Sequence, residues 1–66
     1  MNNDLRERRK QAGLSQADLA AIVDVSRQTV NAIERDRYDP SLELAFKLAK
    51  QFDCRIEELF EADEVS

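Results

Sequence analysis

Apolar residues recur along this chain every three or four positions, which is the spacing of amphipathic helices, and no stretch keeps the period of two typical of a strand. The pattern predicts five short helices and no sheet. They are expected at residues 4–12, from 15 to about 23, at 26–35, from 41 to about 52, and around 56–60. The short connections between them keep consecutive helices adjacent in space.

Local signals mark where these helices begin and end. Three serines, Ser15, Ser26 and Ser41, stand where an N-cap is expected, and Asp18 turns the first of them into a variant capping box. Gly13 ends the first helix, because glycine adopts a positive φ at little cost. Pro40 holds the residue before it away from helical angles and so predicts a loop between the third and fourth helices.

The inward positions of the five helices predict a single core. The second helix turns Leu19, Ala20, Ile22 and Val23 to one side, and the fourth carries an apolar stripe that begins at Leu42. The fold class expected from these faces is all-α, a compact five-helix bundle. Its core is predicted to consist of Leu5, Leu14, Leu19, Ala20, Val23, Val25, Val30, Ile33, Leu42, Ala45, Leu48, Phe52, Ile56, Leu59 and Phe60.

Sixty-six residues suffice for one domain, expected to span 1–66 with its core at 4–60. The chain ends in a short acidic tail at 61–66, and residues 1–3 and roughly 62–66 are expected to be flexible. Cys54 is the only cysteine and there is no histidine, so no internal disulfide, metal site, cofactor or small-molecule ligand is predicted. No apolar run approaches the length of about 18 residues that a membrane span needs, which predicts a cytoplasmic protein without a membrane partner.

The net charge of −4 is unusual for a protein that binds nucleic acid, but the charge is unevenly distributed. Residues 1–38 contain seven basic and six acidic residues, a net charge of +1, whereas residues 39–66 contain three basic and eight acidic residues, a net charge of −5. If the second half faces away from a duplex, the field at the DNA can still be attractive.

The segment from Gln16 to Arg35 carries the functional signal. It predicts two helices of about eight residues, joined by a tight turn and packed at a steep angle, with one face of the second helix left outward. Ala20 is small where the two helices would cross, and Val25 lies in the turn between them. Both residues are therefore expected to support the placement of the outward helix.

The outward face of that helix carries Arg27, Gln28, Asn31 and Arg35, with Thr29 at its edge. An α-helix fits the major groove of B-DNA, where arginine can bond guanine bidentately and glutamine can do the same with adenine. These side chains suit the reading of base edges. An ordinary solvated helix surface is the alternative interpretation, and the pattern alone leaves it open.

The run GLSQADLAAIVDVSRQTVNAIE resembles the helix-turn-helix of the phage repressor and Cro family, also called the xenobiotic-response-element type. The continuation RYDPSLELAFKLAKQF is similar to small stand-alone bacterial and archaeal members such as the cytolysin repressor. The resemblance covers about residues 5–60. It implies the lambda repressor-like fold and a transcriptional regulator that binds double-stranded DNA.

The resemblance also implies roles for matching positions. Gln16 would contact a phosphate and brace the recognition helix, Arg27 and Gln28 would read bases, and Asn31 would contact a base or a phosphate. Glu34 would pair with Arg9 and hold it toward the DNA backbone, with a purely structural ion pair as the alternative. The full set of DNA-binding positions implied is Gln16, Ser26, Arg27, Gln28, Thr29, Asn31, Arg35, Arg37 and Arg9, with Glu34, Ala20 and Val25 supporting the recognition helix.

The chain departs from the family pattern at five positions, one of which is Arg8, where leucine is usual in the first helix. Asp24, Asp36 and Asp53 stand where glycine is usual after a helix, and aspartate tolerates the left-handed region better than most residues. Arg55 replaces the usual serine or threonine cap of the fifth helix, which predicts a frayed start unless Asp53 caps it.

A repressor that acts as a homodimer on a near-palindromic operator is the function expected from these features. The candidate dimer interface is formed by Cys54, Arg55, Leu59, Phe60 and Val65, although Leu59 and Phe60 also fit the core. The alternative is an antitoxin or adaptor module that binds a partner protein through its acidic C-terminal half. An enzyme is not expected, because the clustered acids near the C-terminus lack the burial that tunes a catalytic carboxylate.

Overall fold

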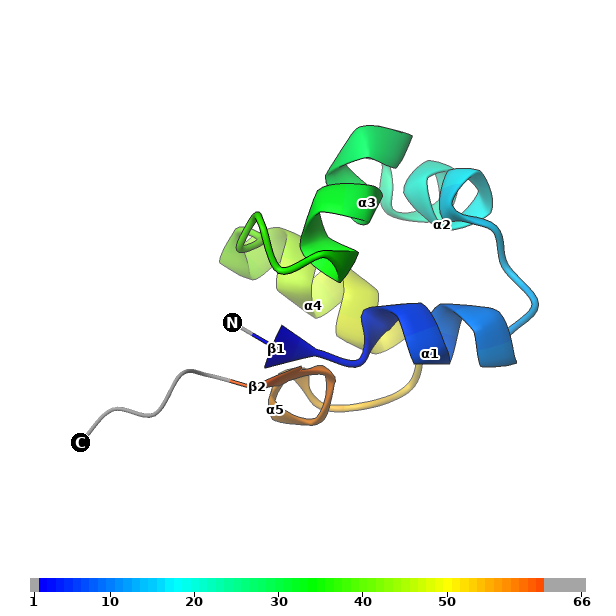
Figure 1. Cartoon of the computed structure of the whole chain (residues 1–66). Helices are drawn as coiled ribbons and strands as arrows, with labels where there is room; N and C mark the ends of the chain where they lie inside the picture. Colours follow the sequence, from blue (N-terminus) through cyan, green and yellow to red (C-terminus); the bar gives the residue numbers. More distant parts are fainter. Residues whose placement is uncertain (1, 62–66) are drawn as a thin grey trace.

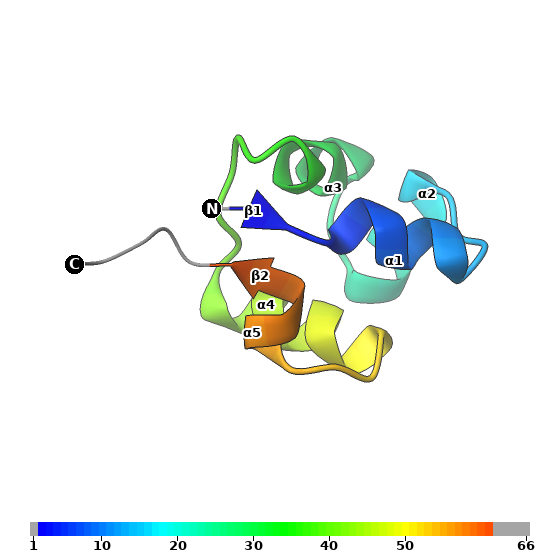
Figure 2. The same cartoon turned by 60° about the horizontal axis from the view of Figure 1, so that its bottom comes forward.

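The computed structural model of this chain describes residues 2–61 and confirms the all-α fold with five helices (Figure 1). The elements in chain order are β1 (Asn2–Asn3), α1 (Leu5–Gln11), α2 (Gln16–Val23), α3 (Arg27–Glu34), α4 (Leu42–Gln51), α5 (Ile56–Leu59) and β2 (Phe60–Glu61). Figures 1 and 2 both show α2 and α3 together at one side of the molecule and α5 with the two strands at the other. None of the helices described is long and apolar enough to cross a membrane.

The predicted serine caps are confirmed. The Oγ atoms of Ser15, Ser26 and Ser41 accept hydrogen bonds from the backbone N–H groups three residues later, at 2.9, 3.1 and 3.2 Å. At the start of α2 the bond is reciprocated, because Asp18 Oδ2 accepts from the Ser15 backbone N–H at 2.9 Å. The capping box therefore satisfies two backbone donors that the helix itself leaves without a partner.

The capping box makes the stability of α2 dependent on pH. Hydrogen bonds from the backbone and then the side chain of Ser15 lower the pKa of Asp18 below its usual value of 3.8. Because the folded-state pKa is the lower one, the stabilisation is fully present above about pH 3.8 and is lost as the pH falls through the lowered value. We expect Asp18→Ala to lower the melting temperature by a few degrees at pH 7. Circular dichroism should show the gap to the parent closing toward pH 3, whereas an equal gap at both pH values would contradict this role.

Four residues that follow helices adopt positive φ, as the departures from the family pattern predicted. Gly13 has φ +73°, and Asp24, Asp36 and Asp53 have φ +61°, +60° and +52°. Left-handed geometry at the end of a helix lets the chain reverse and satisfies its last carbonyls. Aspartate therefore keeps these turns without glycine, and Asp53 does not cap α5. Instead, Glu58 Oε1 accepts the backbone N–H of Arg55 at 2.8 Å and helps to hold the first turn of α5.

Most of the predicted core is confirmed, with two corrections. Leu42 is 68% exposed, and Leu44, which was not predicted, is buried. Two residues this close on a helix point in widely different directions, so the register that buries Leu44, Ala45, Leu48 and Ala49 turns Leu42 outward. Ile22 is also exposed, at 50%, because the face of α2 that packs inward consists of Leu19, Ala20 and Val23.

Asn2 and Asn3 are held in a short strand, which corrects their expected flexibility and the expected absence of any strand pairing. Asn2 and Asn3 pair antiparallel with Glu61 and Phe60. The Asn3 side chain donates to the Ile33 carbonyl at 2.7 Å and accepts the Leu5 N–H at 3.0 Å. The pairing is only two residues long, so it adds a link between the chain ends and the end of α3 without changing the fold class.

Candidate nucleic-acid interface

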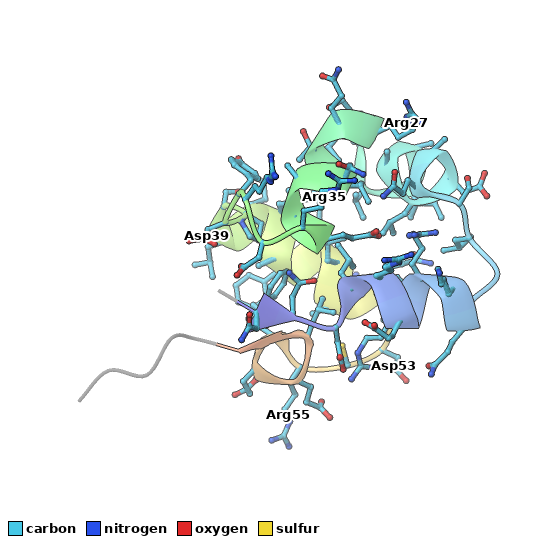
Figure 3. The ribbon with its side chains drawn as sticks, viewed as in Figure 1. Arg27, Arg35, Asp39, Asp53 and Arg55 are labelled. Carbon is cyan, nitrogen blue, oxygen red and sulfur yellow. The ribbon has the colours of Figure 1, made fainter. Side chains whose placement is uncertain are left out.

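The side chains of α3 that were predicted to contact DNA lie at or near the protein surface. Arg27 and Gln28, in its first turn, and Arg35, at its C-cap, are exposed, whereas Asn31 is half-buried. Figure 3 shows Arg27 and Arg35 on the α3 side of the molecule, far from Asp53 and Arg55 at the opposite side. The structure therefore places most of the predicted contact residues on one surface, and separates them from the charged groups around α5.

Ser26 and Thr29 fix the start of α3. The Ser26 hydroxyl caps the helix, and the two hydroxyl oxygens are 3.0 Å apart, within hydrogen-bond distance. Behind them, Ala20 is 4% exposed and its carbonyl accepts the backbone N–H of Val25 at 2.9 Å, while the Val25 side chain packs against the core. These contacts set the angle at which α2 and α3 cross.

A buried ion pair joins α1 to the end of α3. Arg9 Nε and Nη2 donate to the two carboxylate oxygens of Glu34 at 2.6 and 3.2 Å, and Arg9 Nη1 donates to the Leu14 carbonyl at 2.8 Å. The two side chains are only 11% and 3% exposed. The hydrogen bonds to Glu34 raise the pKa of the Arg9 guanidinium above its usual value, against the lowering effect of burial. The pairing of Arg9 with Glu34 that the family resemblance implied is thus present, and most of the Arg9 side chain is buried.

The same carboxylate organises two amide side chains. Gln16 Nε2 donates to Glu34 Oε1 at 3.1 Å, and Asn31 Nδ2 donates to Gln16 Oε1 at 3.4 Å. A chain of polar contacts therefore runs from Arg9 through Glu34 and Gln16 to Asn31 and connects α1, α2 and α3. Because each group restricts the next, Asn31 is held in place at the surface before any ligand arrives.

Two adjoining polar hollows lie along this chain of contacts. Gln16, Arg27, Gln28 and Asn31 line the first, which opens over the start of α3. The second shares Gln16 and Asn31 with it and extends across to α1; it is lined by Arg6, Arg9, Gln16, Asn31, Glu34 and Arg35. Guanidinium and amide donors thus line a continuous surface from α1 to α3, which is the chemistry that binds phosphates and base edges.

Arg6 was not among the predicted contact residues, although the structure places it on this surface. It is exposed and lines the second hollow together with Arg35. Arg6 precedes Arg9 by three positions, so the two lie on the same face of α1. This helical spacing was the signal available in the sequence. Arg37, which was predicted, is exposed in the loop after α3.

The described residues that were predicted to form a dimer interface do not all lie on one surface. Leu59 and Phe60 belong to the core, at 1% and 6% exposed, so these two predicted interface residues fit the core alternative. Because both side chains are buried in the core, little of them is left for a partner. Cys54 is half-buried and Arg55 is exposed, while Val65 lies outside the described residues. Within residues 2–61 no group of acidic or cysteine side chains is placed to hold a metal ion.

Comparison with known proteins agrees with this geometry. A family model described as helix-turn-helix matches residues 5–59. An uncharacterized helix-turn-helix transcriptional regulator of Methanocaldococcus jannaschii is 53% identical over 60 residues, covering 91% of each chain. The uncharacterized regulator YgzD of Bacillus subtilis is 45% identical over 64 residues, covering 97% of each chain.

Two solved structures share the fold. The restriction-modification controller protein C.AhdI of Aeromonas hydrophila superimposes with a TM-score of 0.76 at 41% identity, over 85% of each chain. A hypothetical transcription factor from Neisseria gives a TM-score of 0.74 at 30% identity, over 82% of this chain and 61% of its own. The helix-turn-helix arrangement derived above from caps, core and turns is thus shared by proteins of this kind.

Proposed function

Because this chain belongs to the helix-turn-helix family of transcriptional regulators, of the phage repressor and Cro type, we propose that it is a repressor that binds a near-palindromic operator as a homodimer. The protein is a DNA-binding regulator and not an enzyme. We propose that it acts in the cytoplasm, where it binds the chromosome. Recognition in this proposal is by α3, inserted in the major groove.

One observation carries the proposal: the first turn of α3 presents Arg27 and Gln28 to solvent on a helix that is braced from behind. The serine cap fixes where the helix begins, and the contacts from Arg9 through Glu34 to Gln16 and Asn31 restrain its inner side. A rigid helix loses little conformational entropy on binding, so its exposed donors are available for discrimination between bases. A merely solvated face would need no such support.

A homodimer follows from the size of the reading surface. One short helix contacts too few base pairs for useful specificity, and a two-fold pair of such helices reads two half-sites one helical turn apart, about 34 Å. A repressor of this kind acts by occupying the operator. We infer that the region around α5 faces away from the duplex, since Asp53 and Arg55 lie on the side opposite α3 (Figure 3).

Selection of random double-stranded DNA by the purified protein tests this proposal, and a near-palindromic consensus is the expected result. Arg27→Ala and Gln28→Ala should each weaken binding to the consensus by about 1–3 kcal/mol, or roughly 5- to 150-fold, and relax the preference at one base per half-site. Gln51→Ala is the matched control, because it removes an exposed amide at the end of α4. If both α3 variants bind the consensus as the parent does, α3 is not the reading helix.

A further inference from the structure

Two large apolar side chains stand out on the surface of α4. Leu42 and Phe46 are 68% and 58% exposed, and they lie four residues apart on one face of the helix. Phe46 also borders an open groove between α4 and α5, whose apolar lining includes Ala49, Cys54 and Ile56. Exposed apolar side chains beside an apolar groove mark a surface that another protein covers.

The groove and its neighbouring side chain have complementary shapes. Phe46 protrudes beside a hollow that is mostly apolar and large enough, at about 550 Å³, to receive an aromatic ring. In a two-fold interface the same patch is used by both partners, so a projection beside a hollow is matched twice. The shape of this patch thus suits a second copy of the same chain.

The charges along α4 also favour a second copy in one orientation. Glu43 lies near the beginning of the helix, where it also forms an exposed ion pair with Lys47 at 3.7 Å, and the basic Lys50 lies near the end. An antiparallel α4–α4 pair with its two-fold axis near Phe46 brings Glu43 of each copy beside Lys50 of the other. It also lays each Leu42 on the aliphatic stem of the partner's Lys50. A parallel arrangement would instead place like charges together.

We propose that the α4 surface formed by Leu42, Glu43, Phe46 and Lys50, with the groove beside it, is the interface at which two copies of this chain associate. The inference rests on the homodimer of the proposed function and names the surface that forms it. Cys54 and Arg55, which were predicted to lie in the interface, line the same groove. The buried Leu59 and Phe60 are not part of the proposed interface, which uses exposed residues of α4.

Sedimentation equilibrium of the full chain without DNA tests the interface. The parent is expected to be dimeric at micromolar concentration, and Phe46→Glu should weaken dimerisation by roughly 100-fold or more, because it places a charge at the centre of the interface. Ile22→Glu is the matched control, since Ile22 is 50% exposed on α2 and lies outside the patch. A monomeric parent at tens of micromolar, or a Phe46→Glu variant as dimeric as the parent, would overturn the proposal.

A charge exchange provides a second test that leaves every apolar residue in place. Glu43→Lys and Lys50→Glu should each weaken dimerisation by roughly 3- to 10-fold, and the double variant should recover most of the loss because the opposite charges meet again. The exposed positions of both residues keep the fold intact, as circular dichroism should verify. Weakening that the double variant fails to recover would contradict the antiparallel arrangement.

The two proposals fail in different ways. If the α4 variants become monomers and the parent dimer still selects no DNA consensus, the interface stands and the DNA-binding proposal is wrong. If the parent selects a palindrome while Phe46→Glu stays dimeric, the DNA-binding proposal stands and this interface is wrong.

Discussion

Replacing Glu34 with alanine is expected to cost the domain about 3 kcal/mol of its free energy of unfolding, which is a large part of what a chain of this size possesses. The reason is that Arg9 would remain enclosed, with an exposed fraction of only 11% for its side chain, after losing both of its carboxylate acceptors. Gln16 would lose an acceptor as well. The value is taken from the lower part of the range for buried ion pairs, because water is never far from any group in so small a domain. Urea denaturation followed by circular dichroism measures the loss.

The matched control removes both charges together. Arg9→Met with Glu34→Leu should recover most of the loss, because two apolar side chains leave no unpaired charge inside the protein. The double variant is still expected to bind DNA less well than the parent, since Gln16 and Asn31 lose the carboxylate that anchors them. A loss below about 1 kcal/mol for Glu34→Ala would mean that the pair behaves as a surface salt bridge.

The helices and their starts were predictable because their causes are local. A serine cap, as at Ser15 or Ser41, is a hydrogen bond to the backbone N–H only three residues later, so it needs no partner from elsewhere in the chain. The positive φ at Asp24 was expected from the family resemblance, in which glycine is usual at this position after a helix. The pairing of Arg9 with Glu34, 25 residues apart, came from the family resemblance, since no local pattern specifies it.

The errors arose where tertiary contacts decide between local alternatives. The apolar pattern of α4 admits either Leu42 or Leu44 on the inner face, and only the position of α4 against the rest of the core selects Leu44. The order of Asn2 and Asn3 depends on β2 and on the Ile33 carbonyl, which are distant in sequence. For the site, the contact residues on α3 were predictable, but the hydrogen bond from Asn31 to Gln16 depends on how two helices cross.

The same contrast between local and tertiary causes applies to the two surfaces proposed to bind partners, the one on α3 and the one around Phe46. Residues of α3 were identified because a recognition helix has a characteristic order of residues along the chain. The exposed Phe46 was not identified, because its sequence context is that of any amphipathic helix and only the completed fold shows which apolar residues are left outside. Surfaces of this second kind require the structure.

Specific DNA binding is expected to weaken by about 10³-fold when the salt concentration rises from about 50 to 200 mM. The expectation follows from the exposed arginines Arg6, Arg35 and Arg37, each proposed to contact a phosphate, so that a dimer neutralises about six. Six released counterions correspond to a slope of about −5 in a plot of log K against log salt concentration. Fluorescence anisotropy with the selected operator measures this slope.

Arg6→Gln should make the slope shallower by about 2, because one contact is lost in each of two subunits, and should reduce affinity most strongly at low salt. Arg6→Lys is the control: it keeps the charge, and since a phosphate contact depends mainly on charge, it should leave the slope close to that of the parent. A slope half as steep in the parent would mean that a single subunit binds. Affinity that does not change with salt would rule out the surface between α1 and α3 as a phosphate-binding face, and would leave the polar hollows beside Arg6 and Arg35 without the role proposed for them.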